Sequence, residues 1–150
     1  MKLISHRGNL NGPNKNQENN PDVLDFVIKK GYDVEIDIRK INNNLFLGHD
    51  TPDYLINFDW LLENKDNLWI HCKNLEALTC LIEQNLNIFW HQKDDFTLTS
   101  NGYIWTYPGK QLSKKSIAVM PENCSGLWSH SCLKNSFATC TDYVKKYEAI

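Results

Sequence analysis

The stretch Val34-Glu35-Ile36-Asp37-Ile38 alternates apolar and acidic residues, which predicts a β-strand. Residues two apart on a strand face the same side, so the two carboxylates project together while the three aliphatic side chains pack on the opposite face. Paired carboxylates on one strand face suit a hard divalent cation, which prefers oxygen ligands. An isolated Glu-x-Asp is more often a solvated strand face, so the interpretation depends on the residues around it.

Further short apolar runs alternate with helical or loop stretches along the chain. They are Leu3–Ser5, Leu45–Leu47, Leu68–Ile70, Ile88–Trp90, Tyr103–Thr106, Ile117–Met120 and Phe137–Cys140. Regular alternation of this kind is typical of an α/β protein with parallel strands.

Two helices and one hairpin are predicted between these strands. Pro21-Asp22 opens a helix that ends before Gly31. A second helix covers Leu75–Gln84, with Asn74 as its N-cap. Asn42-Asn43-Asn44 indicates a hairpin turn, because asparagine tolerates left-handed backbone angles.

Length and composition predict a single domain over residues 1–150. The chain is 41% hydrophobic, which is enough for one well-buried core. Its net charge of −2 comes from 16 basic and 18 acidic residues, without the basic excess of a nucleic-acid or membrane surface. We therefore expect no nucleic-acid partner and no stable membrane insertion.

The cysteines and the N-terminus indicate a cytoplasmic location. The five cysteines form an odd set without a Cys-x-x-Cys pair, so neither a disulfide framework nor a standard zinc site is predicted. The chain turns polar at Ser5 after only Leu3 and Ile4, too few apolar residues for a signal peptide.

Two histidines accompany the acidic strand. His6 ends the first predicted strand and precedes Arg7, whose guanidinium could hold a phosphoryl oxygen through two parallel hydrogen bonds. His49, which the predicted hairpin carries back toward the acidic strand, precedes Asp50, a residue that could orient its ring. Either histidine alone would more often be structural than catalytic. Together with an arginine and two carboxylates, they form the minimum set for metal-assisted phosphodiester cleavage.

The polar motifs also have a characteristic order. They read His6-Arg7-Gly8, Glu18-Asn19, Glu35-Ile36-Asp37, His49-Asp50, Ile70-His71-Cys72-Lys73 and Cys140-Thr141-Asp142-Tyr143. This order resembles the glycerophosphodiester phosphodiesterase family, within the phospholipase-C-like phosphodiesterase superfamily. Each piece is short, but the ordered combination runs from one end of the chain to the other and is specific.

The resemblance implies an α/β fold, a TIM-like (β/α) barrel, with a divalent metal ion, Mg²⁺ or Ca²⁺, and a small-molecule phosphodiester substrate. A full barrel needs at least about 200 residues, so we expect an abbreviated barrel with several outer helices shortened or missing. A homodimer could cover the apolar strand faces that missing helices leave bare.

The resemblance also implies residue roles. They are His6 and His49 for proton transfer, Glu35 and Asp37 for metal binding, Arg7 and Lys73 for phosphate binding, and Glu18 as a brace for Arg7 or an outer contact of the metal. In the family's scheme a neighbouring hydroxyl of the substrate attacks phosphorus. Water then opens the resulting cyclic phosphate.

His71 departs from the family pattern, because the family's third metal ligand at this place is normally a glutamate. His71 and Lys73 share a strand face, so the imidazole could reach the same ion. Two carboxylates and one imidazole would favour Mn²⁺, Fe²⁺ or Zn²⁺ over Ca²⁺. Alternatively, His71 ligates nothing, and the two acids and water hold the ion, as is common for Mg²⁺.

The chain also lacks room for the insertion that caps the site in many family members, because only Thr51–Asn67 separates His49-Asp50 from the predicted strand that begins at Leu68. Glycerophosphodiesters are therefore not the assured substrate. Aromatic residues at Trp90-His91, Trp105-Thr106-Tyr107 and Trp128 could line a replacement pocket or simply pack beneath shortened helices.

Three functions are compatible with these motifs. The leading hypothesis is a metal-dependent phosphodiesterase, a phosphoric diester hydrolase. The alternatives are a lyase that stops at the cyclic phosphate and a decayed barrel that binds a phosphorylated ligand without turnover. Retention of both histidines argues against the binding module, because a binder needs no proton-transfer groups.

Overall fold

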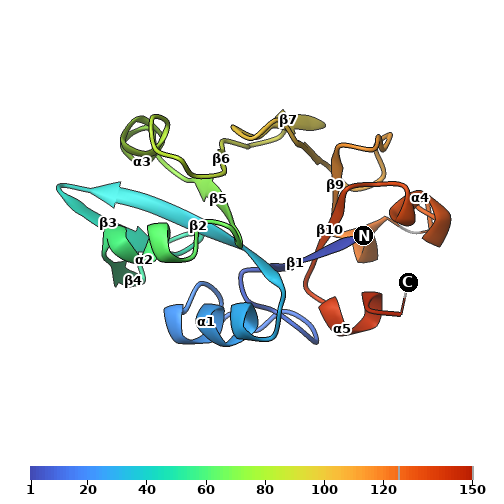
Figure 1. Ribbon diagram of the computed structural model, residues 1–150, viewed down its shortest axis with the longest axis horizontal. Coiled ribbons are helices and arrows are strands. Elements are labelled where there is room, and N and C mark those ends of the chain that lie inside the picture. The colour runs from blue at the N-terminus through green and yellow to red at the C-terminus, as the bar shows by residue number, and fades with distance from the viewer. Residues whose placement is uncertain (125, 150) are drawn as a thin grey trace.

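The computed structural model describes residues 1–124 and 126–149 and is built on a mixed sheet of ten strands (Figure 1). The strands are β1 (Lys2–His6), β2 (Asp33–Ile41), β3 (Asn44–Leu47), β4 (Tyr54–Ile56), β5 (Leu68–Cys72), β6 (Ile88–Phe89), β7 (Phe96–Leu98), β8 (Ile104–Thr106), β9 (Ser116–Val119) and β10 (Ala138–Thr141). A parallel run follows the order β6–β5–β2–β1–β10–β9–β8. Antiparallel pairs add β3 to β2, β4 to β3 and β7 to β8. Each predicted strand overlaps one of these strands, whereas the short strands β4 and β7 were missed.

The predicted TIM-like barrel is wrong. The sheet curls but stays open, since among the described residues β6 pairs only with β5 and β7 only with β8. Few helices accompany the strands in this part of the chain: α1 (Pro21–Lys29), α2 (Phe58–Glu63), α3 (Leu75–Leu81), α4 (His130–Lys134) and α5 (Val144–Tyr147), with a 3₁₀ turn, η1 (Pro121–Asn123), after β9. The result is a strand-rich, curled half-barrel.

The short connections explain why a layer of alternating helices does not form. A parallel crossover that contains a helix needs roughly a dozen residues or more. Only residues 107–115 join β8 to β9, and no α-helix lies between β6 and β9, a stretch that is fully described. Across the described residues, no helix is long and apolar enough to cross a membrane.

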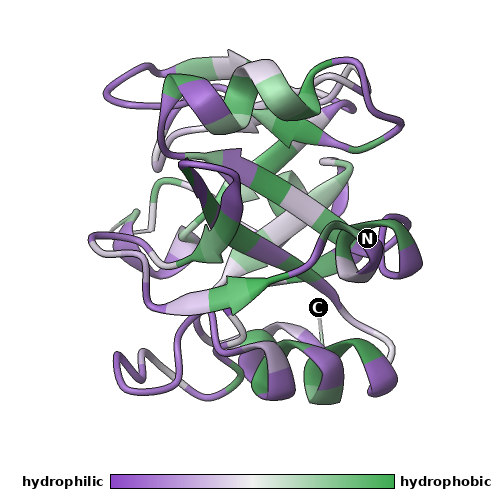
Figure 2. Ribbon diagram, turned by 90° about the vertical axis from the view of Figure 1, so that its left-hand side faces the viewer, coloured by the Kyte–Doolittle hydropathy of each residue, from purple (hydrophilic) through white to green (hydrophobic). Residues whose placement is uncertain are grey.

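The outer face of the curled sheet carries the main hydrophobic core. Val34, Ile36 and Ile38 of β2 are fully buried there, together with Leu24 of α1 and Ala77 of α3. Hydrophobic residues follow the central strands and polar residues gather in the connecting loops (Figure 2). Burying each large aliphatic side chain contributes about 1.5–3 kcal/mol. The aliphatic face of β2 therefore packs against the helices on the outside, and the face with Glu35 and Asp37 turns to the inside of the curl.

The inner face carries a second, aromatic cluster. Trp69, Phe89 and Trp105 are buried in it. The rings of Phe89 and Trp105 stack with centroids 4.4 Å apart, so side-chain packing joins β6 to β8 where backbone pairing is lacking. This cluster forms the floor beneath the polar residues described below.

Strand register brings the polar residues of neighbouring strands together. In the β1–β2 pair, His6 lies beside Glu35, and in the β2–β5 pair Asp37 lies beside His71. The predicted hairpin is confirmed, because Ile41 pairs with Asn44 across an antiparallel turn. The turn includes Asn42 at a φ of +53°, a left-handed conformation that asparagine tolerates.

Asn74, the predicted cap of α3, also clamps this helix to β2. Its Oδ1 accepts hydrogen bonds from the backbone N–H groups of Ala77 at 3.1 Å and Lys40 at 3.0 Å. Its Nδ2 donates to the Lys40 carbonyl oxygen at 2.7 Å. The prediction of Asn74 as N-cap is confirmed, and the contact with β2 adds a tertiary role.

Asn74→Ala is expected to lower the free energy of unfolding by about 1–3 kcal/mol, because it removes the cap and leaves backbone groups of Lys40 without partners. Urea denaturation measures the change. The matched control is Asn57→Ala, which removes one exposed cap bond to the Trp60 N–H of α2 and should cost less. Equal losses in the two variants would show that the clamp to β2 contributes nothing.

Candidate active site

A pocket of about 470 Å³ lies at the carboxyl ends of the parallel strands. The predicted site residues that line it are His6, Arg7, Glu35, His49, His71 and Lys73. Asp37 is fully buried behind them, whereas Glu18 and Asp50 line an adjoining hollow that shares Arg7 and His49 with the pocket. The structure thus brings all the predicted site residues into one neighbourhood.

Glu35, Asp37 and His71 form the most buried part of this site. Each offers one potential ligand atom, and these atoms lie within 4.8 Å of one another. Glu35 Oε2 and Asp37 Oδ1 are buried without a hydrogen-bond partner. Because unpaired buried carboxylate oxygens are costly, two such oxygens beside an imidazole fit a divalent cation as their missing partner.

The two carboxylates differ in their electrostatic surroundings. Burial raises the pKa of Glu35, and the charge of Asp37 raises it further. Burial also acts to raise the pKa of Asp37, but the contact with His71 and the charges of Arg7 and Lys73 outweigh it and hold the pKa below its usual range. Asp37 is therefore the member of the pair whose surroundings favour the ionised form.

The loop after β1 holds Asp37 from the other side. Asn19 Oδ1 accepts a hydrogen bond from the Asp37 N–H at 2.9 Å, and Asn19 Nδ2 donates to Asp37 Oδ2 at 3.1 Å. Arg7 Nε lies 2.9 Å from the same oxygen, and Arg7 Nη1 lies 3.2 Å from Glu18 Oε2. Glu18 Oε1 also accepts from Asn9 at 3.0 Å. The Arg7 guanidinium is therefore held between two carboxylates.

His6 is oriented by Asp142, which follows β10. His6 Nδ1 lies 2.8 Å from Asp142 Oδ1, and its Nε2 lies 3.9 Å from Glu35 Oε2. Burial acts to lower the pKa of His6, but the bond to Asp142 and the charge of Glu35 outweigh it and raise the pKa. Asn9 Nδ2 holds Asp142 through a 2.8 Å hydrogen bond.

Asp142 was missed as a site residue. The motif resemblance included Cys140-Thr141-Asp142-Tyr143 but implied no role in the site for these residues. The position of Asp142 directly after a strand end was the one available signal. The contact itself joins residues 136 positions apart, and no local pattern predicts it.

His49 sits on a loop that requires glycine before it. Gly48 has a φ of +145°, and a Cβ there would collide with the Thr51 carbonyl oxygen. Arg39 fixes the same loop by donating Nη2 to the His49 carbonyl oxygen and Nη1 to the Lys73 carbonyl oxygen, the latter at 3.5 Å. Arg39, the second arginine of the chain, therefore holds the backbone at His49 and Lys73 beside the pocket.

The environment of His49 acts opposite to that of His6. Burial lowers the pKa of His49, and the positive charges of Arg7 and Lys73 lower it too, against the opposing charge of Asp37. Its Nδ1 lies 2.7 Å from Asp50 Oδ1 at the exposed rim. The pKa values of His6 and His49 are therefore shifted in opposite directions within one pocket.

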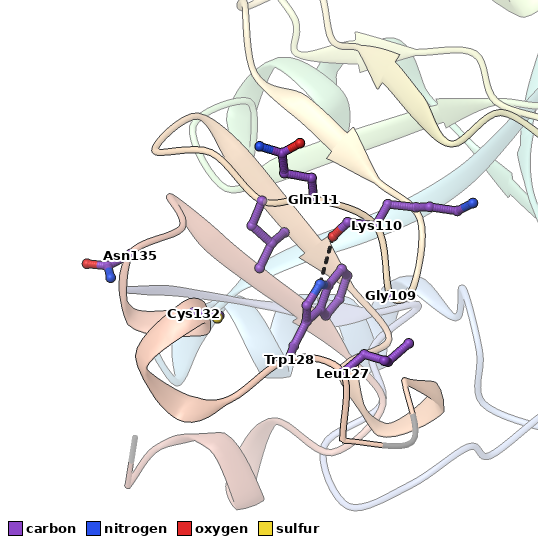
Figure 3. A pocket seen from close by; sticks show the side chains of 8 residues that line it. Gly109, Lys110, Gln111, Leu127, Trp128, Cys132 and Asn135 are labelled. Carbon is purple, nitrogen blue, oxygen red and sulfur yellow. Dashed lines mark hydrogen bonds between the residues drawn. The ribbon is translucent and has the colours of Figure 1, made fainter.

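The remaining wall of the pocket is aromatic. Among the aromatic candidates, His91, Trp105 and Tyr107 line the pocket. Trp90 instead packs against the outer core. Trp128 lines a separate hollow between the β8–β9 connection and α4, where its Nε1 donates to the Lys110 carbonyl oxygen at 2.8 Å (Figure 3).

Comparisons of the chain with protein-family models, with curated proteins and with solved structures gave no match. The chemistry of the site is therefore inferred from its geometry and from the order of its motifs.

Asp142→Asn is expected to lower the pKa of His6, because it removes the negative charge that raises this pKa and leaves burial as the largest effect. The imidazole proton resonances of His6, followed by NMR from pH 5 to 9, measure the change. Asp50→Asn is the control, since Asp50 contacts His49 and not His6. An unchanged His6 titration in Asp142→Asn would contradict the assigned contact.

Proposed function

We propose that this protein is a metal-dependent phosphodiesterase that cleaves glycerophosphodiester-like or other small phosphodiesters with His6 and His49 as its acid–base pair. The observation that carries the proposal is one pocket that is lined by His6 and His49, whose pKa values shift in opposite directions, and by the cationic side chains of Arg7 and Lys73. Cleavage of an anionic diester needs both, because the cations bind the phosphate and the histidines move protons.

The charges of the pocket support binding of an anion together with a metal. Asp37 lies beside both Arg7 and Lys73, and Glu18 lies beside Arg7, so carboxylates already balance these two positive charges. A divalent cation held by the two carboxylates would give the pocket the surplus positive charge that a phosphodiester requires. When bound, such a cation would act as a Lewis acid on a phosphoryl oxygen.

The two pKa shifts suggest separate roles in proton transfer. His49, with its lowered pKa, is suited to remove the proton from an attacking hydroxyl. His6, with its raised pKa, is suited to protonate the leaving alcohol oxygen, and Asp142 keeps its Nδ1 engaged. A bond forms from the attacking oxygen to phosphorus, and the bond from phosphorus to the leaving oxygen breaks.

The motif resemblance implies that the attacking hydroxyl belongs to the substrate, which gives a cyclic phosphate first. Water would then open the ring, with each histidine acting in the opposite sense. Phosphorus NMR of the products identifies the end point. A ring-opened monoester supports the hydrolase, a cyclic phosphate that persists indicates a lyase, and ligand binding without any product indicates a binding module.

His6→Ala and His49→Ala are each expected to lower kcat for bis(p-nitrophenyl) phosphate by about 10²–10⁴-fold, because each removes one proton-transfer group. Circular dichroism checks that the fold is retained. His130→Ala is the control, since His130 is exposed on α4, away from the pocket. A His6→Ala variant as fast as the parent would refute the acid–base assignment.

Removal of divalent cations by dialysis against a chelator is expected to abolish hydrolysis. Carboxylates left without a cation give the pocket no surplus positive charge for an anionic substrate. Re-addition of Mg²⁺, Ca²⁺, Mn²⁺ or Zn²⁺ in separate assays should restore activity with at least one of these ions. Full activity after chelation would exclude metal dependence.

A further inference from the structure

One hydrogen bond determines which ring nitrogen of His71 faces the acidic pair. His71 Nε2 lies 3.0 Å from the backbone carbonyl oxygen of His91. A carbonyl oxygen can only accept, so Nε2 carries the hydrogen. The other nitrogen, Nδ1, lies 3.2 Å from Asp37 Oδ1 and 3.8 Å from Glu35 Oε1.

The orientation of the ring is also fixed by packing. His71 stacks on Phe89, with centroids 5.0 Å apart and an interplanar angle of 11°. Phe89 in turn stacks on Trp105 of the inner cluster. The ring therefore has little freedom to turn Nδ1 away from the two carboxylates.

This arrangement favours a positive charge between the three groups. In a neutral ring with its hydrogen on Nε2, Nδ1 presents a lone pair toward anionic oxygens, which is repulsive. A second proton on Nδ1 could serve Asp37, but Glu35 Oε1 at 3.8 Å lies beyond hydrogen-bond reach. Glu35 Oε2 is buried without a hydrogen-bond partner, and Asp37 Oδ1 has none unless Nδ1 carries a proton. A metal ion could be bound by both carboxylates and the nitrogen at the same time.

We propose that His71 is a direct metal ligand through Nδ1, together with Glu35 and Asp37, and that this nitrogen makes the site prefer Mn²⁺, Fe²⁺ or Zn²⁺ to Mg²⁺ and Ca²⁺. Imidazole suits the transition metals, whereas Mg²⁺ and Ca²⁺ prefer oxygen ligands. A metal-binding histidine usually donates its other N–H to a carbonyl or carboxylate, as Nε2 does here. This role of His71 deepens the proposed function, and it rests on that function only for the part that the ion plays in phosphodiester cleavage.

The direct test is pulsed electron paramagnetic resonance of the Mn²⁺-loaded protein, in which a bound imidazole nitrogen couples to the electron spin. The parent is expected to show the ¹⁴N coupling, and His71→Glu, which supplies oxygen instead, is expected to lose it. His71→Gln is a second variant in case the added charge prevents folding. His91→Ala is the matched control, because it removes a pocket-lining imidazole but keeps the carbonyl that orients His71.

Calorimetric titrations with Mn²⁺ alone and with Mg²⁺ alone give an independent measurement. The parent is expected to bind Mn²⁺ more tightly than Mg²⁺, and this preference should fall by about tenfold or more in His71→Glu. Nitrogen coupling that persists in His71→Glu, an unchanged preference, or no binding of Mn²⁺ to the parent would each overturn the proposal.

None of these measurements requires turnover, so the two proposals can fail separately. A parent with the nitrogen coupling but without phosphodiester hydrolysis would refute the proposed function and keep His71 as a ligand. An active, metal-dependent parent without the coupling would keep the function and refute the role of His71.

Discussion

Two carboxylates buried side by side on β2 are the constraint around which the site is arranged. Glu35 is 2% exposed and Asp37 is fully buried. Removing an ion from water costs several kcal/mol unless charges and hydrogen bonds compensate it, and two like charges add their own repulsion. The neighbours of the pair provide such compensation in part. Arg7 and Asn19 hold Asp37, whereas one oxygen of each carboxylate still lacks a hydrogen-bond partner.

The backbone next to this pair adopts left-handed conformations that place Arg7 and Asn19 against the carboxylates. Arg7 and Asn19 have left-handed φ values of +54° and +60°, and the Asn19 N–H donates to the Arg7 carbonyl oxygen at 3.0 Å. The Arg7 N–H in turn donates to the Glu35 carbonyl oxygen at 3.0 Å. Asparagine tolerates this conformation, whereas in Arg7 it carries strain that persists only where surrounding contacts hold it, and such strain is typical of functional sites. Here the contacts that hold it lead directly to the buried carboxylates.

The strands could be predicted because alternation and apolar runs are local patterns, as in Val34–Ile38 and Leu68–Ile70. The fold class could not, because closure of a sheet depends on whether distant strands pair and on whether each connection has room for a helix. β6 and β8 meet through the rings of Phe89 and Trp105 instead of through hydrogen bonds. Neither this contact nor the open edge has a signature in the sequence.

The sequence by itself determined the residue types of the site and their order, from His6 and Arg7 through the acidic strand to His49 and Lys73. It determined the strand face shared by Glu35 and Asp37, because side chains alternate along any strand. Only the tertiary structure decided that Asp142 orients His6, and that the His91 carbonyl turns Nδ1 of His71 toward the carboxylates. These contacts join residues from different strands and loops, so they depend on register and curl, which no short stretch of sequence encodes.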